Sequence, residues 1–238
     1  MKILSSPIWK QETDKSRECQ YDYDAVKLFI KEALSLLADL EKAYAGWNFK
    51  FHQDDRSATK AVWMLDMECI ETLADAVDLL AAKKHRVAGK LLRFALEAAD
   101  LSALFWAEGD CGSNLKKWYQ EEVILHRTYR EFLRKKGRNA DNAKRKEWYS
   151  VLSKWTHHTH YAINNSYFHG GAGYIAHDGY SSLNDRRSTL FVTPETVYQC
   201  TWLVSGVISL VWAEMCGHGF VGEQEMADLR GVLSCDLG

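Results

Sequence analysis

The sequence predicts an all-α protein, folded as a single bundle of about six long helices. Only two prolines occur in the 238 residues, Pro7 and Pro194, so almost the whole interval between them can be helical without a forced break. Apolar residues make up 47% of the chain and recur at helical spacing along most of it. This is enough material for one packed core, and we therefore expect residues 1–238 to form one domain.

Each helix is expected from an apolar stripe and from its end signals. The stripe from Val26 to Leu40 predicts a first helix over about residues 23–44. The other helices are expected at about residues 58–84, with Ser57 as the N-cap, then at 87–108, 114–136 and 141–164, and finally from Pro194 onward. Gly109 and Gly137 should end the third and fourth helices.

Two segments fall outside this helical pattern. Residues 1–22 are expected to form an N-terminal extension. Residues 165–193 contain four glycines and no sustained period, which predicts a long irregular loop before the last long helix. A loop of this length in a compact domain is more often functional than a simple connection.

The composition narrows the class of protein. The six cysteines include no Cys-x-x-Cys pair, which favours reduced thiols in a cytoplasmic protein over a disulfide scaffold or a zinc ribbon. The N-terminus lacks the apolar stretch of a signal peptide. The most apolar run, residues 202–216, contains Ser205, Gly206, Ser209 and Glu214, so it predicts a buried helix and no membrane partner.

A carboxylate is expected inside the second helix. Asp66 projects between Val62, Ile70 and Leu73, near the middle of the apolar face. A buried carboxylate must find a cation or hydrogen-bond donors, or stay protonated. A structural buried ion pair is the favoured interpretation, and a binding-site carboxylate is the alternative.

The third helix carries a narrow polar strip. Twelve of the sixteen residues from Leu91 to Trp106 are apolar, and Arg93, Glu97 and Asp100 fall on one side of the helix. Such an apolar helix should lie centrally in the bundle. Arg93 and Glu97 are spaced i,i+4 and can pair directly. The strip is either a thin solvent window or one wall of an internal polar site.

The fifth helix brings several polar side chains to the edge of its buried side. These are Tyr149, Ser153, Thr156 and His160, with His157 one step further round. The histidines at 157, 158, 160, 169 and 177 raise the question of a metal site. The paired Glu-x-x-His motifs of di-iron bundles and the HExxH motif are both absent, so neither a metal nor a cofactor is predicted.

A basic cluster marks the turn between the fourth and fifth helices. From Lys116 to Lys154 there are twelve Lys and Arg against five Asp and Glu. The cluster itself consists of Arg134, Lys135, Lys136, Arg138, Lys144, Arg145 and Lys146. It is typical of an ordinary solvated turn, and the alternative is a binding surface for RNA or DNA, with Lys135, Lys136 and Arg145 as contacts.

Two short motifs carry a resemblance to a known family. They are Leu91-Leu92-Arg93 followed by Glu97, and Tyr149 followed by Leu152, Ser153 and His157. In this order they resemble a bacterial helical domain family of unknown function, which is similar to the HEPN-like helical bundles of toxin–antitoxin and phage-defence systems. The resemblance covers about residues 25–215.

The resemblance implies a homodimer that binds nucleic acid or nucleotide. Arg93 would hold phosphate, Glu97 would orient Arg93, and His157 would be the candidate acid or base. HEPN ribonucleases resemble one another in an Arg followed by His after four to six residues, and no Arg of this sequence has that partner. The alternative is a structural or small-ligand-binding bundle with a buried polar network and no catalysis, and a metal-dependent enzyme comes third.

Overall fold

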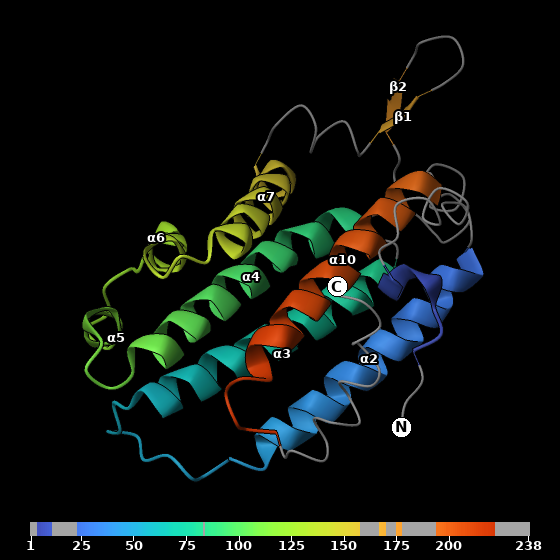
Figure 1. Cartoon of the computed structure of the whole chain (residues 1–238). Helices are drawn as coiled ribbons and strands as arrows, with labels where there is room; N and C mark the ends of the chain where they lie inside the picture. Colours follow the sequence, from blue (N-terminus) through green and yellow to red (C-terminus); the bar gives the residue numbers. More distant parts are fainter. Residues whose placement is uncertain are drawn as a thin grey trace.

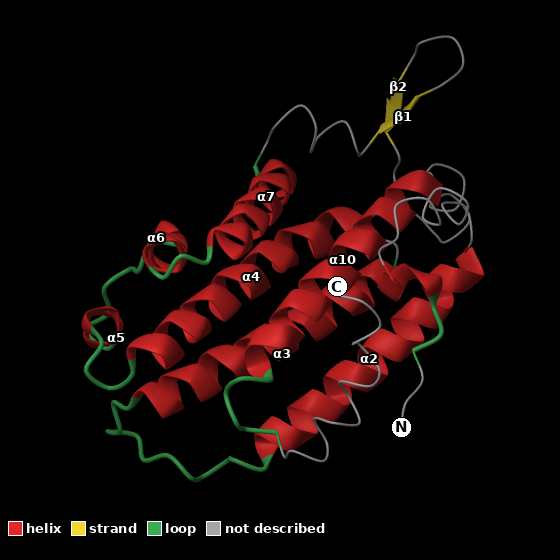
Figure 2. Cartoon of the chain, viewed as in Figure 1, coloured by secondary structure: helices red, strands yellow, loops and turns green. Residues whose placement is uncertain are grey.

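The computed structural model describes residues 4–10, 23–82, 84–157, 167–169, 175–177 and 194–221. The predicted all-α class is confirmed, since long helices dominate this part of the chain (Figure 2). Figure 1 shows the four longest side by side: α2 (Tyr23–Ala45), α3 (Ala58–Ala81), α4 (His85–Glu108) and α10 (Pro194–Met215). Their buried apolar side chains belong to one core.

Helix α4 lies at the centre of the bundle, as its apolar sequence predicts. It packs against α3 and α10 on one side, and against α7 (Asn139–Thr156) on another. The short helices α5 (Ser113–Trp118) and α6 (Arg127–Lys135) also contact it. The helix therefore borders five other elements, so its few polar side chains can meet residues from distant parts of the sequence.

The predicted helix ends agree with the structure where a cap or a glycine marks them. The Ser57 hydroxyl accepts a hydrogen bond from the Lys60 N–H and caps α3. Gly109 ends α4 with a φ of 66°, and Gly137 follows α6 with a φ of 75°. These positive φ values favour glycine, so the two residues stop their helices for the expected reason.

The single helix predicted over residues 114–136 is wrong, because the chain breaks between α5 and α6. Glu121 has a φ of 63°, and its N–H bonds to the Trp118 carbonyl. The Glu122 N–H bonds to the Lys117 carbonyl, which completes the helix-ending turn known as a Schellman motif. Glycine usually occupies the left-handed position of this motif, so a glutamate there left no signal in the sequence.

The predicted fifth helix is also shorter than expected, because α7 ends at Thr156 and not near residue 164. His157 is extended, with φ −87° and ψ 159°. The Thr156 hydroxyl donates to the Ser153 carbonyl, a local bond that competes with continued helix. The side chains of Thr156 and His157 are then held by α4, as described below.

Part of the predicted loop is a short hairpin. Strand β1 (Tyr167–His169) pairs antiparallel with β2 (Ile175–His177), and Tyr167 lies opposite His177. The rest of residues 165–193 lies outside the described residues.

The predicted N-terminal extension contains a short 3₁₀ helix, η1 (Pro7–Lys10), that packs on the bundle. Ile8 is buried in the core, and the Ile8 carbonyl accepts from Ser205 of α10. The Trp9 indole N–H donates to Glu32 of α2 at 2.8 Å. At least residues 5–9 therefore belong to the folded bundle.

None of the helices in the described part of the chain is both long and apolar enough to span a membrane.

Candidate functional site

The polar strip of α4 forms a clamp onto α7. Arg93 Nη1 donates to the Thr156 hydroxyl at 3.1 Å and lies 3.2 Å from His157 Nε2. Arg93 Nη2 donates to the Tyr149 hydroxyl at 2.7 Å. One guanidinium thus joins three side chains that lie 56 to 64 positions further along the sequence. We call Arg93, Glu97, Tyr149, Thr156 and His157 the Arg93 cluster.

Glu97 holds the remaining edge of this guanidinium. Arg93 Nε donates to Glu97 Oε1 at 2.9 Å, which confirms the i,i+4 pairing predicted from the sequence. The pKa of Arg93 is raised above its usual value: burial acts against the charge, but the bonds to Glu97 and Tyr149 outweigh burial. Arg93 is therefore a permanent cation whose Nη atoms face Thr156, His157 and Tyr149.

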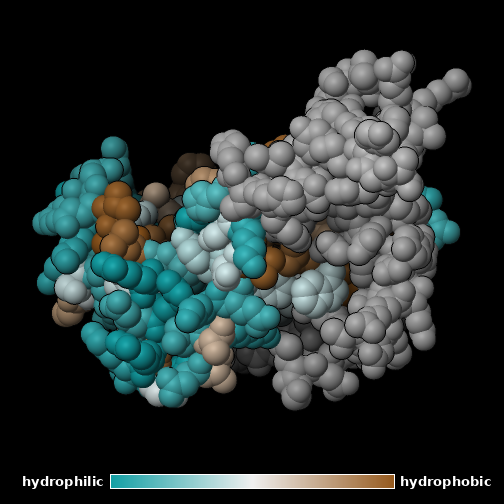
Figure 3. All heavy atoms as spheres, turned by 90° about the horizontal axis from the view of Figure 1, so that it is seen from above, coloured by the Kyte–Doolittle hydropathy of each residue, from teal (hydrophilic) through white to brown (hydrophobic). Residues whose placement is uncertain are grey.

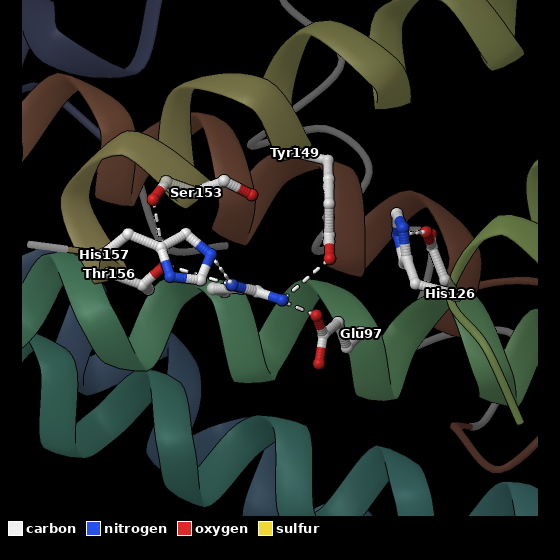
Figure 4. A network of polar contacts seen from close by, with 8 residues as sticks. Glu97, His126, Tyr149, Ser153, Thr156 and His157 are labelled. Atoms are coloured by element: carbon white, nitrogen blue, oxygen red, sulfur yellow. Dashed lines mark hydrogen bonds and ion pairs between the residues drawn. The ribbon is translucent and has the colours of Figure 1, made fainter. Parts of the chain in front are cut away.

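The cluster lies at the rim of the bundle and is only partly shielded from water. The Arg93 side chain is 23% exposed and His157 is exposed. Figure 4 shows His157, Thr156 and Ser153 at one end of a row, Tyr149 and Glu97 in its middle, and His126 at the other end. The Ser153 hydroxyl is buried and finds no hydrogen-bond partner in the described part of the chain.

Asp100, the third member of the strip, belongs to a separate buried ion network. Its carboxylate pairs with Arg145 of α7, and Arg145 also pairs with Glu214 of α10. His126, in the segment before α6, contacts Asp100 through Nε2 at 2.5 Å. Four elements thus meet at Asp100, which places this residue in the interior and not at a solvent window.

His126 is held as a neutral ring in this network. Burial, together with the positive charges of Arg130 and Arg93, lowers the pKa of His126 to about 4, although the negative charge of Glu97 acts in the opposite direction. The neutral ring can still donate its Nε2–H to the Asp100 carboxylate, which also pairs with Arg145. The ring stacks on Tyr149 with centroids 4.0 Å apart, which links this network to the Arg93 cluster.

A pocket of about 440 Å³ opens beside these residues. Its polar lining comes from Arg93, Glu97, Asp100, His126 and Tyr149, together with Glu68 and Thr72 of α3 and Tyr129 of α6. Its apolar lining comes from α4 and from the segment between α5 and α6, and consists of Phe94, Ala98, Leu101, Leu104, Val123, Ile124 and Leu125. The pocket has the size and mixed lining that small-molecule sites have.

Asp66 is buried as predicted, but it does not join the Arg93 cluster. It accepts hydrogen bonds from the Tyr44 hydroxyl at 2.8 Å and from the Ser102 hydroxyl at 2.6 Å. Its third partner is Nδ1 of His218, at 2.7 Å, in the turn after α10. Burial, followed by the charge of Asp66, raises the pKa of Tyr44 well above its usual value, so the phenol stays a donor. This second centre ties α2, α3, α4 and the C-terminal turn together.

The basic turn is only partly the surface that the sequence predicts. Lys135 and Lys136 are exposed, as are Arg134, Arg138, Lys144 and Lys146. Arg145 is a correction: its side chain is 3% exposed, and its guanidinium pairs with Asp100 and Glu214 inside the bundle. It lies three and seven residues before the buried Trp148 and Leu152, and this helical spacing was the available signal for its burial.

Most of the histidines that raise the question of a metal site have side chains outside the described residues. Among the described residues no three His, Cys, Asp or Glu side chains gather as a metal site would require. The side chains of His158, His160, His169 and His177 lie outside the described residues. Burial raises the pKa of the Cys69 and Cys200 thiols, so these two residues stay protonated in the core.

Sequence reasoning missed His126, His218 and Tyr44, all of which contact a predicted carboxylate. His126 and His218 lie outside the regular helices, where helical periodicity says nothing about direction. Tyr44 lies at the end of the apolar side of α2, where the sequence pattern predicts an ordinary core residue.

Comparison with protein-family models, with curated proteins and with solved structures gave no match to this chain.

Proposed function

We propose that this protein is a HEPN-like helical protein that binds a phosphate-bearing ligand, a nucleotide or RNA, at the Arg93 cluster. The observation that carries the proposal is the approach of Arg93 Nη1 to His157 Nε2, at 3.2 Å on the accessible rim of the bundle. Guanidinium groups are the preferred protein partners of phosphate oxygens.

The contact between Arg93 and His157 suits the unliganded state of an anion site. Because an arginine side chain can only donate, His157 Nε2 is the acceptor of this hydrogen bond. A phosphate oxygen is a stronger acceptor than an imidazole nitrogen. When it replaces Nε2 as the partner of Arg93, the His157 ring stays beside the same phosphate.

Other residues of the Arg93 cluster orient the groups that would bind the phosphate. Glu97 fixes Arg93 through Nε, so that the two Nη atoms point toward α7. Thr156 adds a hydroxyl group at the same end of α7 as His157. His157 is the candidate acid or base, and the proposal is binding with no ribonuclease activity of the HEPN type, since the Arg-to-His spacing of those enzymes is missing.

The exposed basic turn extends the proposal from a nucleotide to an RNA strand. Lys135 and Lys136 lie before the start of α7, and His157 follows its end. The 18 residues of this helix span about 27 Å at 1.5 Å per residue. A strand held by phosphate contacts at both ends of α7 should bind in a salt-dependent manner.

Binding of a short single-stranded RNA and of ribose 5-phosphate, measured by calorimetry, tests the proposal. His157→Ala and Arg93→Gln should each weaken the binding of both ligands at least 10-fold. Lys90 is an exposed cation one turn earlier on α4, and Lys90→Gln should leave both affinities unchanged. Because Arg93→Gln also breaks the clamp, circular dichroism must show that it is folded. His157→Ala changes an exposed residue at a helix end, so its affinities decide whether the Arg93 cluster binds phosphate.

The contribution of the basic turn is tested separately. Reversing the charges of Lys135 and Lys136 should weaken the binding of RNA and reduce its dependence on salt concentration. The affinity for ribose 5-phosphate should not change. The same reversal at Lys116 and Lys117, which are exposed on α5, is the matched control. RNA binding that ignores both salt and the reversals at Lys135 and Lys136 would rule out this part of the proposal.

The resemblance to HEPN-like bundles extends the proposal to a homodimer in the cytoplasm with a defence or stress role. Light scattering coupled to size-exclusion chromatography tests the dimer, and a monomer at micromolar concentration would contradict it.

A structural role without a ligand is the second candidate. The observation in its favour is that Glu97, Tyr149, Thr156 and His157 already serve all three nitrogens of Arg93. Under this candidate Arg93→Met lowers the stability of the fold and no phosphate compound binds the parent protein. Binding of ribose 5-phosphate that His157→Ala abolishes would rule it out.

A further inference from the structure

The pocket beside the Arg93 cluster shares three residues with it. Arg93, Glu97 and Tyr149 line the pocket and also belong to the cluster, so the two form one continuous site. Glu97 lies one turn of α4 beyond Arg93, about 6 Å along the helix axis at 1.5 Å per residue. A ligand whose phosphate sits at Arg93 would place its next group in this pocket.

The polar lining of the pocket offers hydrogen-bond acceptors and no unengaged cation. Arg93 is occupied by the cluster, and His126 is neutral. Glu97 uses Oε1 for Arg93, and its Oε2 has no partner among the described residues. Glu68 adds an exposed carboxylate at the edge. This lining favours a group that donates N–H bonds and disfavours a second phosphate.

The remaining walls are apolar and open to water. Phe94 is 64% exposed, Val123 is 87% exposed and Leu125 is 52% exposed, and all three line the pocket. Figure 3 shows apolar side chains within the hydrophilic surface at the α5–α6 end of the molecule. Large exposed apolar side chains around a concave site are typical of contact with a flat apolar ligand such as a heterocyclic ring.

We propose that this pocket is a base subsite that selects guanine, with Glu97 as the residue that reads the base. The proposal rests on the proposed function, because the phosphate of the same nucleotide would bind the Arg93 cluster. Guanine presents two adjacent donors, N1–H and the 2-amino group, on the edge that faces away from the sugar. Adenine and cytosine present one donor next to an acceptor, which a carboxylate repels.

Binding of GMP, IMP, AMP and ribose 5-phosphate to the full chain tests the subsite by calorimetry. GMP should bind about 10-fold more tightly than IMP, which lacks the 2-amino donor to a charged acceptor, and more tightly still than AMP. Glu97→Gln should bring the GMP-to-AMP ratio to within about 2-fold, since an amide can accept on one side only.

Two further variants separate the base from the phosphate without touching Arg93. Ala98→Leu fills the pocket, and Phe94→Ala removes an exposed side chain from its wall. Both variants should lower the affinity for GMP about 10-fold, toward the affinity for ribose 5-phosphate. Phe49→Ala removes another exposed ring, one that does not line the pocket, and it should leave the affinity for GMP unchanged.

The outcomes distinguish the subsite from the phosphate site. If ribose 5-phosphate binds but GMP binds no more tightly than AMP, the guanine subsite is wrong and the phosphate site stands. If GMP binds with its preference intact in Glu97→Gln and Ala98→Leu, the base lies elsewhere and the subsite is wrong. If neither ribose 5-phosphate nor GMP binds, the subsite and the proposed function are both wrong.

Discussion

Replacing Asp66 by alanine should destabilise the fold more than any exposed substitution on the same helix. The change leaves three buried donors, on Tyr44, Ser102 and His218, without their common acceptor. A hydrogen bond to a charged group contributes about 1.5–3 kcal/mol, so the three together set an upper bound of about 4.5–9 kcal/mol. Since neighbouring donors share one site and can relax together, we expect a loss of about 3–5 kcal/mol.

Urea unfolding followed by tryptophan fluorescence measures this loss directly. For a domain of this length, the expected change corresponds to a fall in Tm of about 10 °C. Asp66→Asn keeps the shape and one acceptor oxygen, so it should lose less than Asp66→Ala. Asp75→Ala, on the exposed side of α3, is the matched control and should change the free energy of unfolding by less than about 0.5 kcal/mol. A loss below about 1 kcal/mol in Asp66→Ala would refute the reasoning.

Three further changes test other parts of the structure. Arg145→Ala removes a buried cation and should destabilise the fold by about 3–5 kcal/mol, whereas the exposed Lys146→Ala should cost less than about 0.5 kcal/mol in the same urea titration; equal losses would contradict the buried placement. Burial and the nearby Arg130 lower the pKa of His126 to about 4, below the value of about 6.5 in an unfolded chain. The unfolded state therefore binds the proton first, so the contribution of His126 to stability is full above about pH 6.5 and is lost as the pH falls toward 4. Between pH 6.5 and 4 the urea midpoint of the parent protein should fall by an amount equivalent to about 1–3 kcal/mol, and this dependence on pH should be weaker in His126→Gln; the same dependence in both proteins would show that another group titrates. Glu121→Gly should raise the free energy of unfolding by about 0.5–1 kcal/mol, because glycine tolerates the left-handed backbone at this helix end; a lower Tm would show that the glutamate side chain outweighs the strain.

Helical periodicity correctly predicts which side of its own helix a side chain faces, but it does not predict which residues on other elements that side chain contacts. It placed Asp66 inside the bundle and paired Arg93 with Glu97, because both statements depend on one helix only. The partners of Asp66 come from three other segments, up to 152 positions away. No spacing rule reaches across such distances, so the sequence favoured a buried ion pair for Asp66 but could not name its partners.

The errors in the sequence analysis have local physical causes. The helix over 114–136 breaks at Glu121, a residue that rarely adopts a left-handed backbone. The basic turn was treated as one surface because charge was counted along the chain, although Arg145 lies on the apolar face of α7. The convergence of Arg93 with Thr156 and His157 depends on where α7 stops, and that end is fixed by the tertiary contact itself.

The contact between Ile8 and Ser205 has a consequence for folding during synthesis. The two residues are 197 positions apart, and the buried Ile8 contacts a helix that is synthesised much later. At about 5–20 residues per second, the ribosome needs roughly 10–40 s to cover that interval. The η1 segment therefore lacks its partner on α10 throughout that interval, and this part of the core can close only after α10 has been made. A substitution at Ile8 should lower the soluble yield from cells more than its effect on the free energy of unfolding would suggest.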